Sequence, residues 1–180
     1  QSCNMDKVME IAQKHNLYVI EDCAQAHGAK YSGQSIGTFG TIGCFSFYPT
    51  KPMGALGDSG AIVTKDIRIA EKIRKLRNYG SGVKYVNELE GINSRMDEVQ
   101  AAALKVTLRH LDDGNEYRRK IAKRYLTEIN NPLINLPKTN PNSTHVYHVF
   151  AVTTEKRNEL QKYLLDSEVK TLIHYPIPPH

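Results

Sequence analysis

Hydrophobic positions along the first twenty residues change from a helical to a strand-like pattern. Apolar residues recur at the three- and four-residue spacing of an amphipathic helix, at Met5, Val8, Ile11 and Ala12. The pattern stops at His15, and the apolar run 17–20 then predicts a buried strand that ends at Glu21 and Asp22. A helix followed at once by a buried strand is half of an α/β unit, so we expect an α/β fold.

The residues that follow predict short strands separated by glycine-rich turns. Four glycines make 23–40 a loop, and the alternating segment 42–48 predicts a strand that Pro49 stops. After a glycine-bearing turn over 54–60, the apolar run 61–64 predicts a further strand. The first half of the chain is therefore expected to contain several short strands.

Helices dominate the middle of the sequence. Asp66 is placed to cap a helix that reaches about Asn78 and ends before Gly80. Two longer helices are expected from about 96 to 111 and from about 114 to 128.

The last part of the chain predicts a strand over 145–152, a helix over 156–166 and a strand over 169–174. This order indicates a small α/β lobe that is separate from the first sheet. We place the boundary within the long helices, which divides the chain into 1–111 and 112–180.

Neither the cysteines nor the histidines predict a metal site. Cys3, Cys23 and Cys44 contain no C-x-x-C pair, which argues against a disulfide framework and a zinc knuckle and favours a reducing cytoplasm. His145 and His148 are three residues apart on a predicted strand, so their side chains are expected on opposite faces.

Composition and charge exclude some classes of protein. The chain is 40% hydrophobic and 24% charged, as globular proteins are, and no apolar run approaches the roughly 20 residues of a membrane helix. The formal charge of +5 raises the question of nucleic-acid binding. The densest basic stretches, 68–77 and 118–124, have the periodicity of solvated helix faces, so nucleic-acid binding stays a distant alternative.

The sequence begins at Gln1 and opens directly into a helical pattern, without the apolar core of a signal peptide. We therefore expect the chain to be a piece of a longer protein.

Two residues are candidates for chemistry. Asp22 follows a buried strand, where ligands bind in open α/β sheets, although a turn or capping role is equally open from position alone. Lys51 lies between an apolar strand and a glycine-bearing turn. Burial disfavours an ammonium ion, which leaves the nucleophilic amine that a Schiff-base lysine needs, although a lone lysine is usually a surface charge.

Taken together, these two residues indicate more than either does alone. Gln25, Ser46 and several glycines lie between Asp22 and Lys51. A pyridoxal phosphate site requires such groups: an amine for the Schiff base, a carboxylate that keeps the pyridine nitrogen protonated, and hydroxyl and N–H groups for the phosphate.

Ordered motifs strengthen this interpretation. They are EDCAQAHG over 21–28, GCFSFYPTK ending at Lys51, GALGDSGA over 54–61, RNYG over 77–80, GINSR over 91–95, DEVQAA over 97–102 and IHYP over 173–176. From about Leu17 to the last residue, the chain resembles the DegT–StrS family of pyridoxal-phosphate-dependent nucleotide-sugar aminotransferases. The resemblance implies part of the large-domain sheet of an aspartate-aminotransferase-like, fold type I enzyme over 1–111. It implies a linking helix and part of a smaller C-terminal α/β lobe over 112–180.

The resemblance also assigns roles at the cofactor. It implies that Lys51 forms the Schiff base with pyridoxal 5′-phosphate and moves protons. Asp22 would pair with the pyridinium nitrogen, Gln25 would pack near the ring hydroxyl, and Ser46 would bind the phosphate.

Further roles follow at a shared site. Because this family's sites lie at a dimer interface, Asn93 is expected to reach the cofactor phosphate in the neighbouring subunit of a homodimer. Arg95 would approach the nucleotide-sugar phosphates there. His174 and Tyr175 resemble residues that line the sugar-nucleotide pocket.

The activity implied is transamination of a nucleotide-linked keto-deoxysugar with L-glutamate as the amino donor. Lys51 stands where the dehydratases of this family carry histidine, which favours transamination. The run 93–98 and the closing run 175–180 look most like the branch that acts on dTDP-3-keto-6-deoxyhexoses. The resemblance places such an enzyme in the cytoplasm, in deoxyamino-sugar and polysaccharide biosynthesis, with no membrane or nucleic-acid partner.

The sequence departs from the family pattern at three points. Pro52 replaces a common asparagine and removes an N–H beside Lys51, and Ser59 replaces a common glycine. Family chains are about twice as long, and their amino-terminal part supplies a Gly-Thr phosphate-binding turn and a ring-stacking aromatic. The alternative hypothesis is therefore a non-catalytic folded remnant or interaction module.

Overall fold

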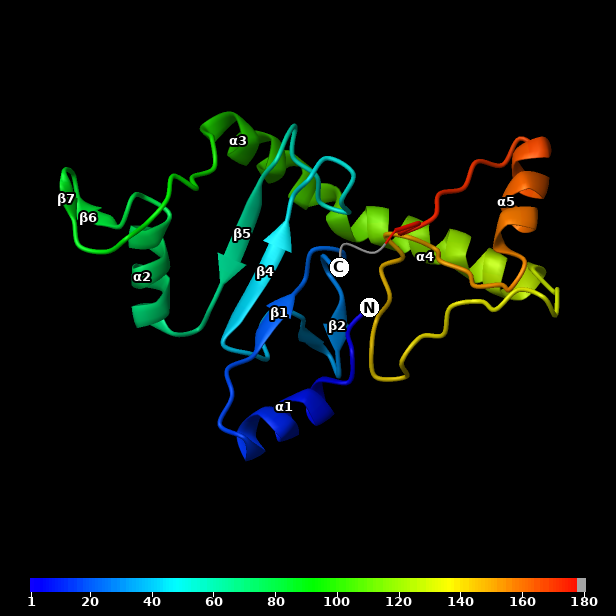
Figure 1. The fold of residues 1–180 in the computed structure, drawn as a ribbon, viewed down its shortest axis with the longest axis horizontal. Helices are drawn as coiled ribbons and strands as arrows, with labels where there is room; N and C mark the ends of the chain where they lie inside the picture. Colours follow the sequence, from blue (N-terminus) through cyan, green and yellow to red (C-terminus); the bar gives the residue numbers. More distant parts are fainter. Residues whose placement is uncertain (178–180) are drawn as a thin grey trace.

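The structure is a computed structural model and describes residues 1–177, so 178–180 of the closing run lie outside the described residues. A mixed sheet occupies the first half, and a long helix leads away from it to the last helix (Figure 1). The helices are α1 Met5–Lys14, α2 Ile67–Leu76, α3 Glu98–Thr107, a 3₁₀ turn at Leu108–His110, α4 Leu111–Glu128 and α5 Arg157–Asp166. The strands are β1 Ile20–Asp22, β2 Lys30–Tyr31, β3 Gln34–Ser35, β4 Ile42–Ser46, β5 Gly60–Val63, β6 Ser81–Val83 and β7 Val86–Asn87.

The central sheet has the strand order β1-β4-β5, with β1 parallel and β5 antiparallel to β4. Paired residues on neighbouring strands share a face of a sheet. One face carries Ile20, Asp22, Ile42, Cys44, Ser46 and Ile62, and the opposite face carries Glu21, Gly43, Phe45, Ala61 and Val63.

The second of these faces contacts the hydrophobic core. Phe45 packs against two clusters. One cluster is Cys23, Ala26, Ala29, Ile36 and Val146, and the other is Phe47, Ala55 and Leu104 of α3. The core therefore joins the sheet both to α3 and to a segment more than a hundred residues later in the chain.

The other face of the sheet is open. Ile20 and Ile62 are 66% and 50% exposed, and a groove of about 830 Å³ runs between this face and α2. Leu17 and Tyr18 are also exposed, which corrects the prediction of a buried strand over 17–20. The strand begins only at Ile20.

A buried carboxylate fixes the loop before β4. Glu21 accepts hydrogen bonds from the N–H groups of Gly37 at 2.6 Å, Phe39 at 2.8 Å and Gly40 at 2.7 Å. Gly37 has φ +81°, and a Cβ there would lie 2.9 Å from the Phe45 ring, so this turn requires glycine. The loop is thereby attached to the strand that ends in Asp22.

The second half of the chain returns to the sheet (Figure 1). Ser143 forms an isolated bridge with Tyr31, and the N–H of Thr144 donates to the carbonyl of Lys30 at 2.8 Å. Val146 is completely buried against Ala26 and its neighbours. The segment after α4 is thus held against the loop that follows β1.

The strands predicted over 145–152 and 169–174 are wrong, because the described residues offer neither segment a ladder partner. Next to the first of these segments, an isolated bridge joins Thr153 to Asn135. Val146 is buried by tertiary packing, which gives the same apolar signal as a strand.

The helix predictions are largely confirmed. The structure has α2 at 67–76, α3 at 98–107 and α5 at 157–166. The expected break near Gly114 is absent, since α4 runs from Leu111 through this glycine. The mixed α/β class is confirmed, while the division at residue 111 stays a prediction. Within the described residues, no helix is both long and apolar enough to cross a membrane.

Replacing Glu21 with Ala should lower the free energy of unfolding by about 2–4 kcal/mol, because one buried and two partly buried N–H groups lose their acceptor. Urea denaturation measures the change. Glu71→Ala, on the exposed surface of α2, is the matched control and should change it by less than about 0.5 kcal/mol. Equal effects of the two substitutions would contradict this role for Glu21.

Candidate functional site

The carboxyl ends of β1 and β4 lie at one edge of the sheet because the two strands are parallel. Asp22 pairs with Cys44, and Ser46 stands two residues farther along β4 on the same face. At about 3.3 Å per residue, the two positions differ by roughly 7 Å along the strands. The register therefore brings Asp22 and Ser46 together at this edge.

Asp22 is exposed, and only one of its two carboxylate oxygens accepts a hydrogen bond among the described residues. Its Oδ1 accepts a hydrogen bond from the N–H of Ala24 at 3.0 Å, which fixes the turn after β1. Its other carboxylate oxygen has no hydrogen bond within the part of the chain that the structure describes. Gln25, also exposed, directs its side chain to no partner among those residues.

Lys51 is held by a closed loop at the same edge. Its N–H donates to the carbonyl of Tyr48 at 2.8 Å, and Ala55 donates to the carbonyl of Phe47 at 2.8 Å. Within 1–177 the half-buried side chain of Lys51 makes neither an ion pair nor a hydrogen bond. Its amine is therefore available for other chemistry.

The two sequence departures lie close to this lysine. The loop's hydrogen bonds use the N–H groups of Lys51 and Ala55, so the N–H missing at Pro52 removes none of them. Ser59 donates no side-chain bond, and its Oγ is buried without a partner among the described residues.

Asn93 and Arg95 lie together beside the end of α2. Arg95 donates to Oδ1 of Asn93 at 3.2 Å and to Oδ1 of Asn78 at 3.0 Å, just beyond α2. Its guanidinium carbon lies 5.6 Å from the centre of the Tyr79 ring. The structure groups these residues with α2, and their expected role in a neighbouring subunit stays a prediction.

His174 and Tyr175 are exposed near the end of the described chain, with ring centres 5.2 Å apart. His174 lies near His148, and its charge is one of those that lower the pKa of that histidine. His174, one of the residues predicted to contact the sugar nucleotide, therefore lies near His148, to which the sequence assigned no role.

His27 is a second residue that sequence reasoning missed. It is 2% exposed and lies between Phe45 and Phe47, with ring-centre distances of 5.5 and 5.7 Å. Neither ring nitrogen has a hydrogen-bond partner among the described residues. Burial lowers its pKa to about 4, the carbonyl of Ser46 opposes the shift, and the charge of Lys51 adds to it.

His148 lies near the same lysine. It is half-buried, and burial lowers its pKa, to which the charges of Lys51, Arg118 and His174 contribute. The sequence predicted that His148 lies on a strand over 145–152. That strand is absent, so the prediction did not show which residues surround His148. Only the folding of 143–148 onto the first sheet places it here.

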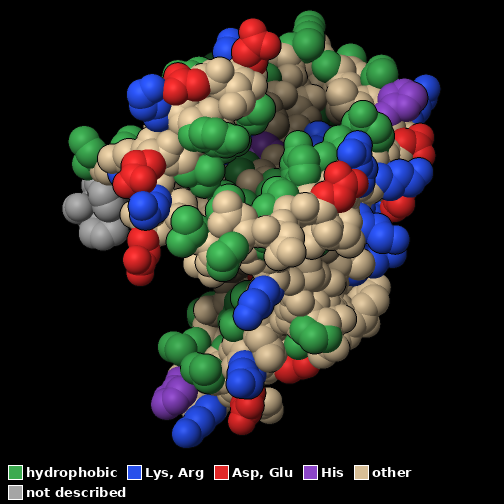
Figure 2. All heavy atoms as spheres, turned by 90° about the vertical axis from the view of Figure 1, so that its right-hand side faces the viewer, with side chains coloured by type: hydrophobic (Ala, Val, Ile, Leu, Met, Phe, Trp, Pro, Cys, Tyr) green, Lys and Arg blue, Asp and Glu red, His purple; other side chains and the backbone are tan. Residues whose placement is uncertain are grey.

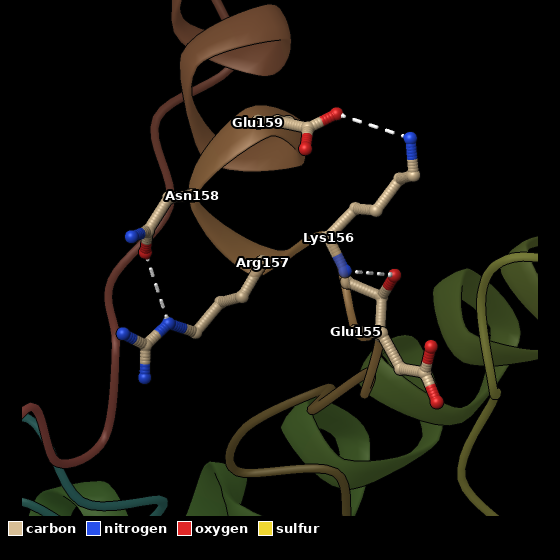
Figure 3. A pocket seen from close by; sticks show the side chains of 6 residues that line it. Glu155, Lys156, Arg157, Asn158 and Glu159 are labelled. Carbon is tan, nitrogen blue, oxygen red and sulfur yellow. Dashed lines mark hydrogen bonds and ion pairs between the residues drawn. The ribbon is translucent and has the colours of Figure 1, made fainter.

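A separate hollow of about 400 Å³ opens at the start of α5 (Figure 3). Lys156 forms an ion pair with Glu159 at 3.4 Å, and Arg157 donates to the side chain of Asn158 at 3.2 Å. No predicted site residue lines it, so it is not the candidate site. Residues 1–177 contain no cluster of three potential metal ligands.

A comparison with protein families decides the relationship. The model of the DegT/DnrJ/EryC1/StrS aminotransferase family matches residues 1–180. The chain belongs to this family.

Individual members of the DegT/DnrJ/EryC1/StrS family are close in sequence and structure. The dTDP-3-amino-3,6-dideoxy-alpha-D-galactopyranose transaminase of Aneurinibacillus thermoaerophilus is 54% identical over 180 residues, which are 100% of this chain and 50% of that protein. The crystal structure of S. venezuelae DesV in complex with a ketimine intermediate has a TM-score of 0.96 at 48% identity, over 100% of this chain and 49% of that one.

A more distant structure, NtdA from Bacillus subtilis with bound PMP, has a TM-score of 0.87 at 31% identity, over 98% of this chain and 42% of that one. The fold type I architecture expected from the sequence is thereby confirmed. The chain spans about half the length of the relatives that it matches.

The stability of the protein should depend on pH through His27. Its pKa lies below that of an unfolded histidine, so the unfolded state binds more protons and stability falls with pH from about 6.5 toward about 4. Between about pH 7 and about pH 5, this histidine should account for a loss of up to about 2 kcal/mol. Chemical denaturation at several pH values measures it.

His27→Phe keeps an aromatic ring between Phe45 and Phe47 and removes the titration, so its stability should vary less with pH. His145, whose pKa burial also lowers to about 4, contributes equally to parent and variant. Parallel pH profiles for the two proteins would contradict the prediction.

Proposed function

We propose that this chain forms the lysine-bearing part of a pyridoxal-phosphate-dependent nucleotide-sugar aminotransferase. The observation that carries the proposal is the amine of Lys51, unpaired among the described residues, at the sheet edge that also carries Asp22 and Ser46. Family membership and the transaminase named among the relatives support it. The reaction is the transfer of the amino group of L-glutamate to a nucleotide-linked keto-deoxysugar, a dTDP-3-keto-6-deoxyhexose.

The residues at this edge fit the cofactor. Asp22 has a carboxylate oxygen without a partner, Ser46 supplies a hydroxyl on the same face, and Lys51 supplies an amine. Gln25 is exposed in the turn directly after Asp22. This donor set matches the pyridine nitrogen, phosphate, aldehyde and ring hydroxyl of pyridoxal phosphate.

When bound, pyridoxal phosphate supplies an electron sink that makes the Cα–H bond of the amino donor acidic. Asp22 holds the proton on the pyridine nitrogen, which preserves that sink. The hydroxyl of Ser46 donates to the phosphate, and Gln25 contacts the ring hydroxyl. Lys51 takes the proton from Cα of the donor.

The remaining roles belong to the assembled enzyme. Asn93 and Arg95 serve the cofactor phosphate and the sugar nucleotide of a neighbouring subunit in a homodimer, and His174 and Tyr175 contact the sugar nucleotide. Asn93 and Arg95 form hydrogen bonds with each other and with Asn78 next to α2, which is compatible with a role in a neighbouring subunit. Residues 1–111 belong to the large domain and 112–180 to the linking helix and small domain, in a cytoplasmic enzyme of deoxyamino-sugar and polysaccharide biosynthesis.

Covalent labelling tests the cofactor lysine. The 180-residue chain is incubated with pyridoxal phosphate and reduced with borohydride, and mass spectrometry of its peptides should find the cofactor on Lys51. Lys51→Ala should lose that label, whereas Lys65→Ala, which removes an exposed lysine, should keep it. An unlabelled parent chain would favour the inert remnant, and equal labelling at many lysines would contradict a specific site.

Asp22→Asn tests the partner of the pyridine nitrogen. Labelling at Lys51 should persist, because the amine is unchanged, but the glutamate-driven loss of the cofactor's visible absorbance should slow by about 100-fold. Stopped-flow absorbance measures the rate. Asp58→Asn, on the exposed loop after Lys51, is the matched control. The same rate in both variants would contradict the role of Asp22.

A further inference from the structure

A group of basic side chains next to Lys51 has no acidic partner. We call Lys51, Arg118, His148 and His174 the basic cluster. The described residues form six ion pairs, and none of these pairs includes a member of the cluster. A half-buried guanidinium such as that of Arg118 is unfavourable without a counter-ion unless an anion completes the site.

Helix α4 directs Arg118 toward the strand edge. Asn115 lies one turn earlier on the same helix face, is 1% exposed, and donates to the carbonyl of His27 at 2.9 Å. Residues three apart on a helix are neighbours on its surface. The face of α4 that carries Arg118 is therefore the face that meets the turn after β1.

Arg118 differs from the other arginines of α4. Arg119 pairs with Glu116 at 2.8 Å, and Arg124 pairs with Glu128 at 2.9 Å. Arg118 is half-buried, and its guanidinium makes neither an ion pair nor a hydrogen bond within residues 1–177. Its Nη1 lies 3.4 Å from the point that a Cβ on Gly114 would occupy, so it remains close to the helix.

The segment 143–148 supplies the next member of the cluster. The bridge from Ser143 to Tyr31 and the burial of Val146 hold this segment in place. His148 is half-buried at the end of this segment. The charges of Lys51, Arg118 and His174 all lower its pKa. The charges of Lys51 and His148 also lower the pKa of His27.

The view from the side of α5 shows a hollow in this half of the molecule (Figure 2). Histidine and Lys or Arg side chains are visible inside it, and hydrophobic side chains surround its mouth. A recess of this kind strengthens electrostatic attraction, because its walls exclude water.

We propose that Arg118 and His148 bind an oxyanion of a substrate next to Lys51, the proposed cofactor lysine. Two substrates of the proposed reaction carry such a group: the amino donor has carboxylates and the sugar nucleotide has a diphosphate. The identity of the ligand rests on the proposed function, whereas the existence of the anion site does not. The planar guanidinium suits either group, because it binds two oxygens at once.

The test uses the 180-residue chain without cofactor and two non-reacting probes, glutarate and dTDP. Isothermal titration calorimetry at low ionic strength measures the affinity of each. Arg118→Gln should weaken the binding of at least one probe by about 10-fold or more, the effect of losing a charge-assisted bond. The matched control is Arg119→Gln, which removes a neighbouring arginine that already has a partner and should leave the affinity within about 2-fold.

A second pair of variants tests the histidine. His148→Gln should reduce the gain in affinity that the parent shows when the pH falls from about 8 to about 6, because an anion favours the protonated imidazole. His145→Gln, three residues earlier, should keep that gain. Circular dichroism confirms that each variant is folded, and Arg118→Lys keeps the charge and should restore part of the affinity if Arg118→Gln unfolds.

The outcomes separate the two possible ligands and the two proposals. Weakened glutarate binding with unchanged dTDP binding supports a site for the donor carboxylate, and the reverse supports a site for the diphosphate. The proposal is overturned if the parent binds neither probe, or if Arg118→Gln behaves like Arg119→Gln. Failure to label Lys51 with pyridoxal phosphate would count against the proposed function and leave this anion measurement intact.

Discussion

The hydrogen bonds of the Glu21 carboxylate are the interaction on which the site depends. Three backbone N–H groups of the loop before β4 converge on this one buried side chain. Because successive residues of a strand point to opposite faces, holding Glu21 in the core directs Asp22 to the other face. The same loop leads into β4, so the anchor also sets the position of Ser46 relative to Asp22.

The site is completed by contacts between distant parts of the chain. Asn115 attaches α4 to the turn after β1, and Val146 attaches the later segment to the same region. These contacts place Arg118 and His148 at an edge that already carries Lys51. The result is an edge that carries the carboxylate of Asp22 together with basic side chains that form no ion pair among the described residues.

Most strands of the first half could be predicted from the sequence, and cofactor residues could be proposed there, because the signals are local. The glycine loop, the short strands and the motif around Lys51 each lie within about ten residues of sequence. The predicted strand over 145–152 was wrong because Val146 is apolar for a different reason: it fills a core formed by Ala26 and Ala29. An apolar residue indicates that its position is buried, but it does not indicate which part of the chain packs against it.

The sequence by itself determined the α/β class and the resemblance to sugar aminotransferases. That resemblance predicts that Asp22, Ser46 and Lys51 hold a cofactor. Only the tertiary structure decided that His27 is buried with unpartnered nitrogens, and that Arg118 and His148 lie with Lys51. Residues from α4 and from the segment after it have no common periodicity in the sequence. Their proximity arises from packing across more than sixty residues of intervening chain, which no local pattern records.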